Sequence, residues 1–270
     1  MKFSVLMSIY NKENPEYFNR CMKSIWDEQT IKPDEIVLVE DGLLNEQLYN
    51  IIEKWQNKLG KIFKRVFLKQ NVGTGKAKNE GLKYCSYELI AIMDTDDISL
   101  PKRFEKQLEI FKTNNIDVCG SWVSEFEDYE TNIISFRKVP KSHEKIVEFA
   151  KKRMPVNHPS IMYKKNIALN AGGYKHMLWF EDYYLMVRMI LNGAKFYNIQ
   201  EPLVKMRIGY EQLKRRSGFR YIQAEIKFLI TIKQEGFLNN YEFIRNLFFR
   251  LIARLMPKFF LKQIYKILRQ

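Results

Sequence analysis

Residues 89–97 read Leu-Ile-Ala-Ile-Met-Asp-Thr-Asp-Asp, so that an apolar run passes directly into three carboxylates. The five apolar residues predict a buried strand, and the aspartates stand where that strand must end. Carboxylates crowded in this way repel one another unless a cation lies among them. A hard divalent cation with oxygen ligands, Mg²⁺ or Mn²⁺, suits this position and commonly bridges a carboxylate to a substrate diphosphate. The alternative is a polar turn in which Asp97 or Ser99 caps a helix that Pro101 begins.

Strand and helix patterns alternate through the N-terminal part of the chain. We expect strands at residues 3–9, 35–40, 62–68 and 87–93, separated by helices at 15–28, 45–59 and 75–85. This alternation predicts an α/β fold with a mostly parallel sheet and helices on both faces, in which ligands bind beyond the carboxyl ends of the strands. Those ends carry Tyr10 with Asn11, Asp41, Asn71 with Gly73, and the three aspartates. The sequence therefore predicts one site along one edge of the sheet.

The later part of the chain follows without a Pro/Gly-rich linker or an internal repeat. We expect a helix to about Asn114, then strands near 118–125 and 133–139, a helix over 142–153, a short apolar run at 160–163 and a helix from 181 to 191. Residues 1–205 are interpreted as one domain. Residues 206–270 are interpreted as a basic loop followed by amphipathic helices.

Composition is typical of a folded protein, because 46% of the 270 residues are hydrophobic and 14% are aromatic. The three cysteines, Cys21, Cys85 and Cys119, show neither disulfide nor zinc spacing, which favours a reducing cytoplasm. The apolar run that begins the chain is too short for a signal peptide, and no apolar stretch approaches the length of a membrane span. We therefore expect a protein that is soluble or lies on a surface.

The net charge of +14 is concentrated at the C-terminal end, where residues 205–270 contain 15 Lys/Arg against 4 Glu. In residues 243–256, one helical face carries Ile244, Leu247, Phe248, Leu251 and Leu255, and another carries Arg250 and Arg254. Beyond Pro257, apolar and basic residues continue to alternate. This pattern favours helices that lie in an anionic membrane interface. The alternative is a helix packed on the catalytic domain with a solvated basic face; nucleic-acid binding is not expected, because no motif for it is present.

The polar strand ends offer the parts of a nucleotide site. The ring of Tyr10 can stack on a base, and Asp41 can accept hydrogen bonds from a base edge or a ribose. A ribose or diphosphate could be approached by Asn71, Gly73, Lys78 and Asn79. Separately, Glu181 and Asp182 stand at a predicted helix start, where backbone N–H groups stabilise an anion that could take a proton from an attacking hydroxyl.

As an ordered set, these segments resemble an inverting family-two nucleotide-sugar glycosyltransferase of the GT-A fold, of the type that builds bacterial O-antigen and capsule. The resemblance rests on Ser8-Ile9-Tyr10-Asn11, Glu40-Asp41-Gly42, Asn71-Val72-Gly73 with Ala77-Lys78-Asn79-Glu80-Gly81, Asp94-Thr95-Asp96-Asp97 and Glu181-Asp182. It implies a nucleotide-sugar-binding half at about 1–100, an acceptor-binding half at about 101–205 and a metal-dependent hexosyl transfer.

Residue by residue, the resemblance implies that Tyr10 and Asp41 hold the nucleobase and that Asp94 faces the ribose or sugar. Asp96, with Asp94 beside it, would ligate Mn²⁺ or Mg²⁺. Asp182 would be the catalytic base, with Glu181 orienting the acceptor or ligands. The further nucleotide-sugar contacts implied are Ser8, Asn11, Asn71, Gly73, Lys78, Asn79 and Thr95. The chain departs from the pattern at Glu40, which replaces an Asp, and at Lys78, which replaces an Arg and loses its bidentate geometry.

The implied donor is a UDP-sugar, and the implied acceptor is a saccharide on a polyprenyl diphosphate at the cytoplasmic face of the bacterial inner membrane. His158, Trp179 and Arg207 are candidates for contacts with the acceptor or the diphosphate. Their alternatives are a structural histidine, core packing and a solvated basic loop, respectively. A rival activity is a sugar-phosphate nucleotidyltransferase, whose Gly-rich loop would be expected where Ser8-Ile9-Tyr10-Asn11 stands.

Overall fold

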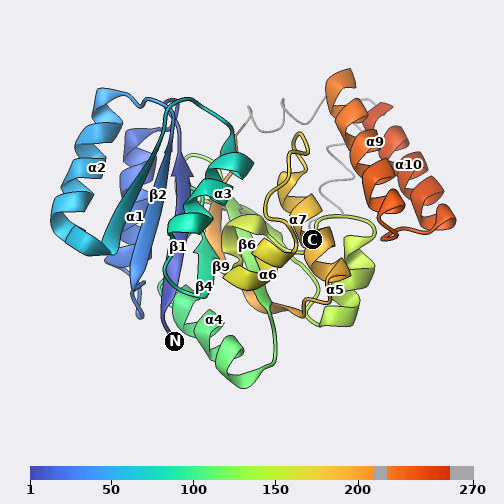
Figure 1. Ribbon diagram of the computed structural model, residues 1–270, viewed down its shortest axis with the longest axis horizontal. Coiled ribbons are helices and arrows are strands. Elements are labelled where there is room, and N and C mark those ends of the chain that lie inside the picture. Colours follow the sequence, from blue (N-terminus) through green and yellow to red (C-terminus); the bar gives the residue numbers. More distant parts are fainter. Residues whose placement is uncertain (210–217, 256–270) are drawn as a thin grey trace.

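A nine-stranded mixed sheet runs through the centre of the computed structural model, which describes residues 1–209 and 218–255 (Figure 1). Its strand order is β3-β2-β1-β4-β8-β6-β9-β5, and β7 pairs with β6. The strands are β1 (Phe3–Ile9), β2 (Glu35–Asp41), β3 (Phe63–Leu68), β4 (Leu89–Ile92), β5 (Ile98–Ser99), β6 (Val118–Phe126), β7 (Ile133–Arg137), β8 (Met162–Lys164) and β9 (Phe196–Arg207).

The first four strands form the parallel part of the sheet. β1 lies between β2 and β4, and Ser4 is in register with both Glu35 and Ile90. All four strands run in the same direction, so their carboxyl ends share one edge, as the sequence predicted. The rest of the sheet is mixed, because the short strand β8 enters antiparallel to both β4 and β6. Its three residues carry too little pattern to reveal their direction.

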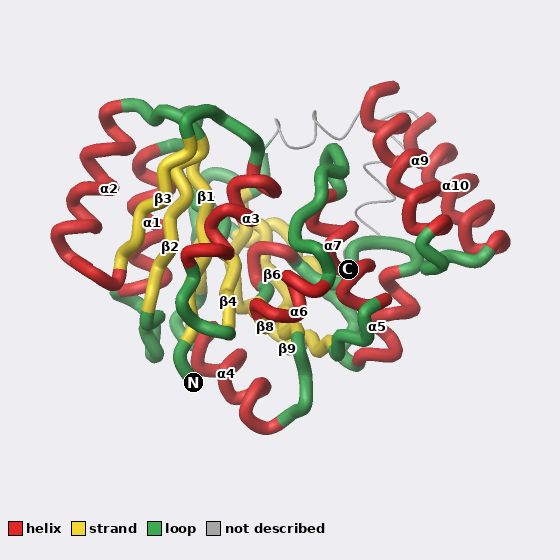
Figure 2. Tube along the Cα trace, viewed as in Figure 1, coloured by secondary structure: helices red, strands yellow, loops and turns green. Residues whose placement is uncertain are grey.

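Helices cover both faces of the sheet (Figure 2). The alternation of side chains along β1 assigns them to one face or the other. Phe3, Val5, Met7 and Ile9 point to the face covered by α1 (Pro15–Trp26), α2 (Glu46–Leu59) and α4 (Arg103–Thr113). Leu6 points to the other face, where it joins the apolar side chains of α3 (Thr74–Tyr84), α6 (Lys165–Asn170) and α7 (Glu181–Leu191). The expected α/β layering is therefore present.

Helix ends follow local signals. α1 begins where the side chain of Asn14 accepts hydrogen bonds from the N–H groups of Glu16 and Tyr17. The alternative that Asp97 or Ser99 caps the helix after Pro101 is wrong, because α4 begins at Arg103 with Lys102 as its N-cap. Ser99 instead belongs to β5.

The C-terminal helices pack against the sheet domain. After α5 (His143–Ala150), β9 continues to Arg207, so the predicted boundary at 205 falls inside a strand. α9 (Phe219–Gln234) packs on α7 through one apolar cluster that includes Phe180, Tyr183 and Phe228, and α10 (Asn240–Leu255) lies beside α9. None of the helices in the described ranges is long and apolar enough to cross a bilayer. The basic loop predicted after residue 209 and the Lys-rich segment beyond Pro257 lie outside the described residues.

Candidate active site

A cavity of about 740 Å³ opens at the carboxyl edge of the parallel strands. Four of the residues predicted for the nucleotide, Tyr10, Asn11, Asp41 and Asn71, line it together. Tyr10 is 39% exposed, so its ring is available to a ligand. The remaining lining residues, which the sequence did not single out as ligand contacts, are Lys12, Gly42, Leu43, Lys69 and Gln70.

The carboxylate of Asp41 is held by the loop after β3. One oxygen accepts a hydrogen bond of 2.7 Å from the N–H of Val72, and the other accepts one of 3.0 Å from the N–H of Gly73. Gly73 has φ of +88°, a conformation that favours glycine and that allows α3 to begin at the next residue. Gly42 is equally constrained, since a Cβ there would lie 2.8 Å from the backbone nitrogen of Asn71. The two loops therefore fix Asp41 at the edge of the cavity.

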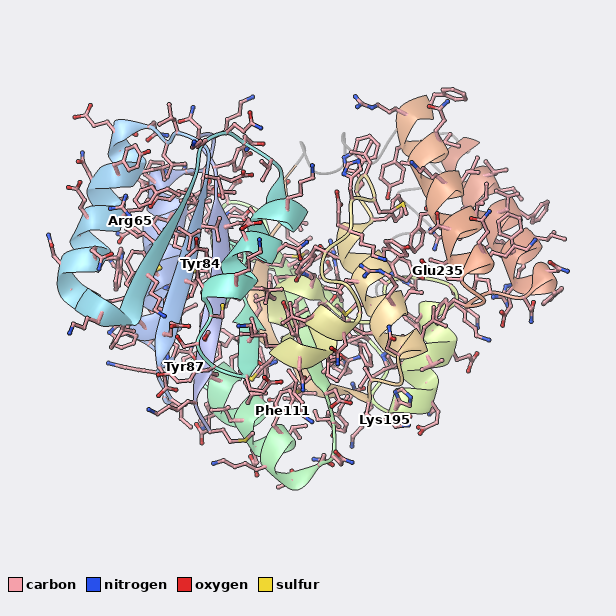
Figure 3. The ribbon with its side chains drawn as sticks, viewed as in Figure 1. Arg65, Tyr84, Tyr87, Phe111, Lys195 and Glu235 are labelled. Atoms are coloured by element: carbon pink, nitrogen blue, oxygen red, sulfur yellow. The ribbon has the colours of Figure 1, made fainter. Side chains whose placement is uncertain are left out.

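Glu40 has turned away from this cavity. Its carboxylate accepts a 2.6 Å hydrogen bond from Nε of Arg65 on β3, and Glu40 is almost fully buried. Arg65 is labelled in Figure 3. The exchange of Asp for Glu at this position therefore serves an ion pair inside the sheet.

The aspartate turn after β4 carries three carboxylates in three different environments. Asp97 is buried and accepts a 2.8 Å hydrogen bond from the N–H of Arg207, so it faces the protein. Burial, together with the charges of Glu13 and Asp94, raises the pKa of Asp96 to about 7. This shift identifies a place where negative charge is concentrated and where a cation would be stabilised. The hydroxyl of Thr95 donates to Glu13 at 2.6 Å, which fixes Glu13 beside the turn.

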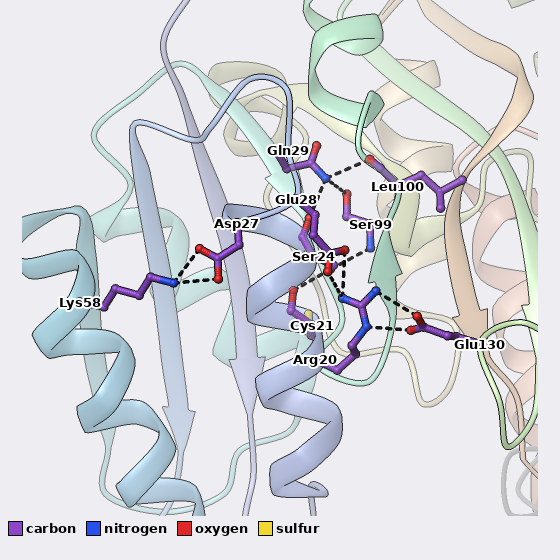
Figure 4. Close-up of polar contacts among 10 residues, drawn as sticks. All are labelled: Arg20, Cys21, Ser24, Asp27, Glu28, Gln29, Lys58, Ser99, Leu100 and Glu130. Carbon is purple, nitrogen blue, oxygen red and sulfur yellow. Dashed lines mark hydrogen bonds and ion pairs between the residues drawn. The ribbon is translucent and has the colours of Figure 1, made fainter.

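The segment that follows the turn is anchored to α1. Nε2 of Gln29 donates to Oγ of Ser99 at 3.2 Å and to the carbonyl of Leu100 at 2.9 Å, while Oγ of Ser24 accepts from the N–H of Ser99 (Figure 4). These bonds are buried or partly buried. They hold the exit of the aspartate turn in one position.

Lys78 pairs with Asp94 beneath the site. Its Nζ donates to Oδ1 of Asp94 at 3.0 Å, and Lys78 is almost fully buried. Burial alone would lower the pKa of Lys78, but the nearby charges of Asp94 and Asp182 raise it. One ammonium group therefore faces carboxylates from two segments far apart in the sequence.

Asp182 lies in the first turn of α7, where the sequence predicted a base. Its Oδ1 lies 3.3 Å from Nε2 of His158, but this buried oxygen has no hydrogen bond. Nε2 of His158 is also 3.0 Å from the hydroxyl of Tyr174. Burial lowers the pKa of His158, although the charge of Asp182 opposes this shift. A neutral imidazole beside an incompletely bonded carboxylate leaves that carboxylate able to accept a proton.

Glu181 contacts the start of α3. A Cβ at Gly75 would lie 3.2 Å from Cγ of Glu181, so glycine permits this close approach. Burial raises the pKa of Glu181, and Asp182 adds to the shift. The start of α7 therefore lies against the start of α3.

The profile of the family described as "Glycosyl transferase family 2" matches residues 4–170, more than half of the chain. The chain belongs to glycosyl transferase family 2. Among curated relatives, it is 38% identical over 261 residues to "Amylovoran biosynthesis glycosyltransferase AmsE" of Erwinia amylovora, with 94% of each chain covered. It is 36% identical over 266 residues to "UDP-Gal:alpha-D-GlcNAc-diphosphoundecaprenol beta-1,3-galactosyltransferase" of Escherichia coli, covering 98% of this chain and 95% of the relative.

Solved structures agree with this assignment at the level of the fold. S. aureus TarS 1-349 in complex with UDP-GlcNAc matches with a TM-score of 0.67 and 20% identity, covering 92% of this chain and 70% of that one. The mannosyltransferase PcManGT from Pyrobaculum calidifontis, in complex with GDP-Man and Mn²⁺, matches with a TM-score of 0.65 and 13% identity, covering 93% and 69%. The expected GT-A fold and glycosyltransferase family are thus confirmed.

Several predicted contacts of this glycosyl transferase have partners within the protein. The amide of Asn79 donates to the carbonyl of Tyr174 at 2.6 Å and accepts from its N–H at 2.7 Å, and so ties α3 to the turn before α7. Oγ of Ser8 lies 3.2 Å from Oγ1 of Thr74. Trp179 is 37% exposed and adopts φ of +64°, a strained conformation for a bulky residue. Only Phe180 separates it in the sequence from the acidic pair at the start of α7.

Arg207 lies at the end of β9, so the expectation of a loop at this position is wrong. Its guanidinium lies 3.6 Å from the ring centre of Tyr17 and donates to the carbonyls of Asp96, Glu127 and Asp128. Arg207 therefore links the aspartate turn to the end of β6 and the residues after it.

Arg103 and Glu13 are site residues that the sequence did not single out. The guanidinium of Arg103 is fully buried beneath the aspartate turn, donates to the carbonyl of Ile92 at 2.7 Å, and lowers the pKa of Asp94 together with Lys78. In the linear sequence, Arg103 is one more basic residue on an amphipathic helix. Glu13 could have been suspected from its position just after the first strand end.

The residues present fit a divalent cation that is held partly by carboxylates of the protein and partly by oxygen atoms of a substrate. In residues 1–209 and 218–255, no cluster of three or more His, Cys, Asp or Glu side chains is arranged to hold a metal alone. However, Asp96 has a raised pKa beside Asp94 and Glu13, which is the charge pattern that a cation relieves. Mg²⁺ and similar ions are commonly held by one or two carboxylates plus phosphate oxygens.

Proposed function

We propose that this enzyme is a metal-dependent, inverting hexosyltransferase. It moves a hexose or N-acetylhexosamine from a UDP-sugar to a lipid-diphosphate-linked saccharide during assembly of a bacterial surface polysaccharide. The full-length match to the Escherichia coli galactosyltransferase supports both substrates, because that relative's name specifies a UDP-sugar and a diphosphoundecaprenol acceptor. The similarity to the amylovoran glycosyltransferase supports the polysaccharide pathway.

The donor would lie across the carboxyl edge of β1, β2, β3 and β4. Tyr10 would stack on the uracil, and the loop that Asp41 organises would face the base and ribose. Asn11 and Asn71 line the same cavity and supply amide groups for a ribose or a base edge. Lys78 would act through its ion pair by fixing Asp94 next to the sugar.

Asp96, with Asp94 beside it, would hold Mn²⁺ or Mg²⁺ against the diphosphate. Bound there, the cation would neutralise the charge of the departing nucleoside diphosphate. Arg103 and Arg207 would keep the turn in place from below and from the side, since their donors reach the carbonyls of Ile92 and Asp96.

The position of the Asp182 carboxylate is the observation that carries the catalytic proposal, because the side chain is 38% exposed while its buried Oδ1 lies 3.3 Å from Nε2 of His158. The acceptor hydroxyl attacks the anomeric carbon from the side opposite the diphosphate, and Asp182 takes its proton. The new bond joins the acceptor oxygen to the anomeric carbon, while the bond to the diphosphate oxygen breaks. A single displacement inverts the configuration. His158 would restrict the rotation of the carboxylate from 3.3 Å away.

The acceptor would approach over the start of α7. Trp179 would stack on its sugar ring, and Glu181 would orient its hydroxyl groups. A polyprenyl-linked acceptor would require the enzyme to work at the cytoplasmic face of the inner membrane, as a peripheral protein.

The test is a screen of UDP- and GDP-sugars with the purified full-length protein and a synthetic lipid-diphosphate monosaccharide, in Mn²⁺, Mg²⁺ or EDTA. We expect one UDP-sugar to yield a disaccharide, detected by mass, with an inverted anomeric configuration by NMR and no product in EDTA. Activity that persists in EDTA would contradict the metal proposal. Release of pyrophosphate from UTP and a sugar phosphate, without a disaccharide, would favour the nucleotidyltransferase.

A further inference from the structure

The exposed side of α10 carries large apolar side chains. Tyr241 is 72% exposed, and Ile244, Phe248, Phe249 and Ile252 are also exposed along the same helix. We call these five residues the outer face of α10. In Figure 1, α10 lies at the end of the molecule opposite α2, with this helix pair outermost. Contiguous exposed apolar side chains of this kind on one element are uncommon in a protein that meets only water.

Arg250 and Asn246, two polar side chains of α10, point inward instead. Arg250 donates to Glu225 on α9 at 2.7 Å and to the carbonyl of Lys152 at 2.8 Å. Asn246 is buried and donates to the carbonyl of Lys151. Phe243 and Leu247 pack on the apolar cluster between α7 and α9. The prediction that Arg250 and Leu247 lie on different faces is therefore wrong, because both are on the side of α10 that packs against the rest of the protein.

The acids of this helix pair are all engaged. In the described part of α9 and α10, Glu225 pairs with Arg250 and Glu242 pairs with Lys151 at 2.7 Å. Glu235, which follows α9, accepts a hydrogen bond from the hydroxyl of Tyr184 on α7, and its position near α9 is visible in Figure 3. Cations remain toward solvent, with Arg220 and Lys227 exposed on α9 and Arg245 half-buried on α10. The helix pair therefore presents apolar and positive groups together.

We propose that the outer face of α10 inserts into an anionic lipid bilayer surface. This proposal rests on the proposed function, because a lipid-linked acceptor would then be reached in the plane of the membrane. Aromatic and aliphatic side chains flanked by Lys and Arg match the chemistry of the interface and its negative headgroups.

The charge of the chain favours a lipid surface over the two other possible partners of the outer face of α10, which are a second copy of the chain and residues 256–270. A second copy would bring Arg245 and its neighbours against their own counterparts, and like charges repel. Residues 256–270 contain Lys258, Lys262, Lys266 and Arg269 without one acid, so they add positive charge to whatever they approach. An anionic surface attracts both the cations of α9 and α10 and those of residues 256–270.

The test compares the double variant Phe248→Ser/Phe249→Ser with Phe67→Ser in the full chain. Phe67 is a matched control, because it is as exposed as Phe249, at 64%, but lies on β3. In flotation with vesicles of phosphatidylglycerol and phosphatidylcholine, we expect the double variant to bind at least about tenfold more weakly than the native protein. Phe67→Ser should bind normally, and vesicles of phosphatidylcholine alone should bind the native protein weakly. Equal binding of both variants would overturn the proposal.

A second measurement reports on the free protein. The variant Phe249→Cys can be labelled with a polarity-sensitive dye, because Cys21, Cys85 and Cys119 are buried. We expect polar emission in buffer and a blue shift with anionic vesicles. A blue shift in buffer alone would show that the chain or a second copy covers this face, and would overturn the proposal.

Transferase assays separate this proposal from the proposed function. If the double variant retains activity on a short-chain soluble acceptor but loses it on an acceptor embedded in vesicles, both proposals stand. If the native protein binds anionic vesicles through this face but transfers no sugar to either acceptor, the proposed function fails and the membrane surface remains.

Discussion

Asp41 and Asp182, which we propose for the nucleobase end and the catalytic end of the donor site, are held in opposite ways. Both oxygens of Asp41 accept backbone hydrogen bonds, from Val72 and Gly73. The side chain of Asp182 is 38% exposed, and its Oδ1 has no hydrogen bond and only a 3.3 Å approach to His158. A fully bonded carboxylate stabilises the loops around it, whereas an incompletely bonded one contributes little to them.

This difference separates a structural carboxylate from one that is available to a ligand. Asp41 joins the loops after β2 and β3 and so fixes one wall of the cavity. Asp182 makes fewer contacts with its neighbours, as the proposed role in accepting a proton requires. If the proposal is correct, Asp41 serves stability and Asp182 serves chemistry, and substitutions should divide accordingly.

The substitution Asp182→Asn should have the largest effect, on turnover alone. We expect kcat to fall by about 10²–10⁴-fold, because an amide cannot accept the proton of the attacking hydroxyl. Affinity for UDP, measured by calorimetry, should stay near the native value. The free energy of unfolding should be nearly unchanged, since the Asp182 side chain is 38% exposed and makes no hydrogen bond through Oδ1. Near-native turnover would refute the assignment of the base.

The substitution Asp41→Ala should reverse this pattern. It leaves two backbone N–H groups without their acceptor, and we expect a loss of about 2–4 kcal/mol in the free energy of unfolding by urea denaturation. UDP should bind roughly tenfold more weakly, because the loop that lines the cavity loosens. The variant Asp41→Asn is the control, because it keeps one accepting oxygen and should lose about half as much. Unchanged stability in Asp41→Ala would break the distinction between the two ends.

Substitution of Trp179 should have a smaller effect, which is confined to the KM for the acceptor. We expect Trp179→Ala and Trp179→Gly both to raise the acceptor KM by about tenfold, with donor KM unchanged, since both remove a half-exposed ring beside Asp182. Because the position has φ of +64°, the Gly variant should be more stable than the Ala variant by about 1 kcal/mol. An unchanged acceptor KM in both would show that the ring serves packing, for which its contact with Tyr221 is available.

Local patterns predicted the strand ends and the start of α7 well, because each depends on neighbours in the sequence. The range expected for the last helix of the domain, 181–191, is the range of α7, since acids mark its start and glycine follows soon after its end. The residues at the edge of β1 to β4 meet because parallel strands place their carboxyl ends together. These parts of the fold and of the site could be predicted.

Partners distant in the sequence could not be predicted. The amide of Asn79 bonds to Tyr174, 95 residues away, and the carboxylate of Asp97 bonds to the N–H of Arg207, 110 residues away. Neither pairing leaves a local signal, because it depends on how β9 and the turn before α7 are placed. Similarly, the apolar periodicity of α10 predicted a helix but not which side packs inward, because apolar residues occur on both sides. The inward side is the one that carries Arg250, which pairs with Glu225 on α9.

The smallest expected effect concerns the pH dependence of stability at the proposed catalytic end, where His158 is buried. By contrast, the described residues that line the cavity beside Tyr10 include no histidine. Burial lowers the pKa of His158 below its value of about 6.5 in the unfolded chain. Between these two values the unfolded state binds more protons, so stability should be lost as the pH falls through 6.5 toward the folded pKa.

The substitution His158→Gln should remove this part of the pH dependence. We expect the loss in the free energy of unfolding between pH 7.5 and pH 5.5, measured by urea denaturation, to be smaller in the variant by at most about 1.4 kcal/mol, the limit for the one pH unit below 6.5. His143, whose pKa burial also lowers, is present in both proteins and cancels in the comparison. If the two proteins lose stability in parallel, His158 is not held neutral beside Asp182. The carboxylate would then share a proton with the imidazole, and the catalytic end would resemble the nucleobase end in having a satisfied carboxylate.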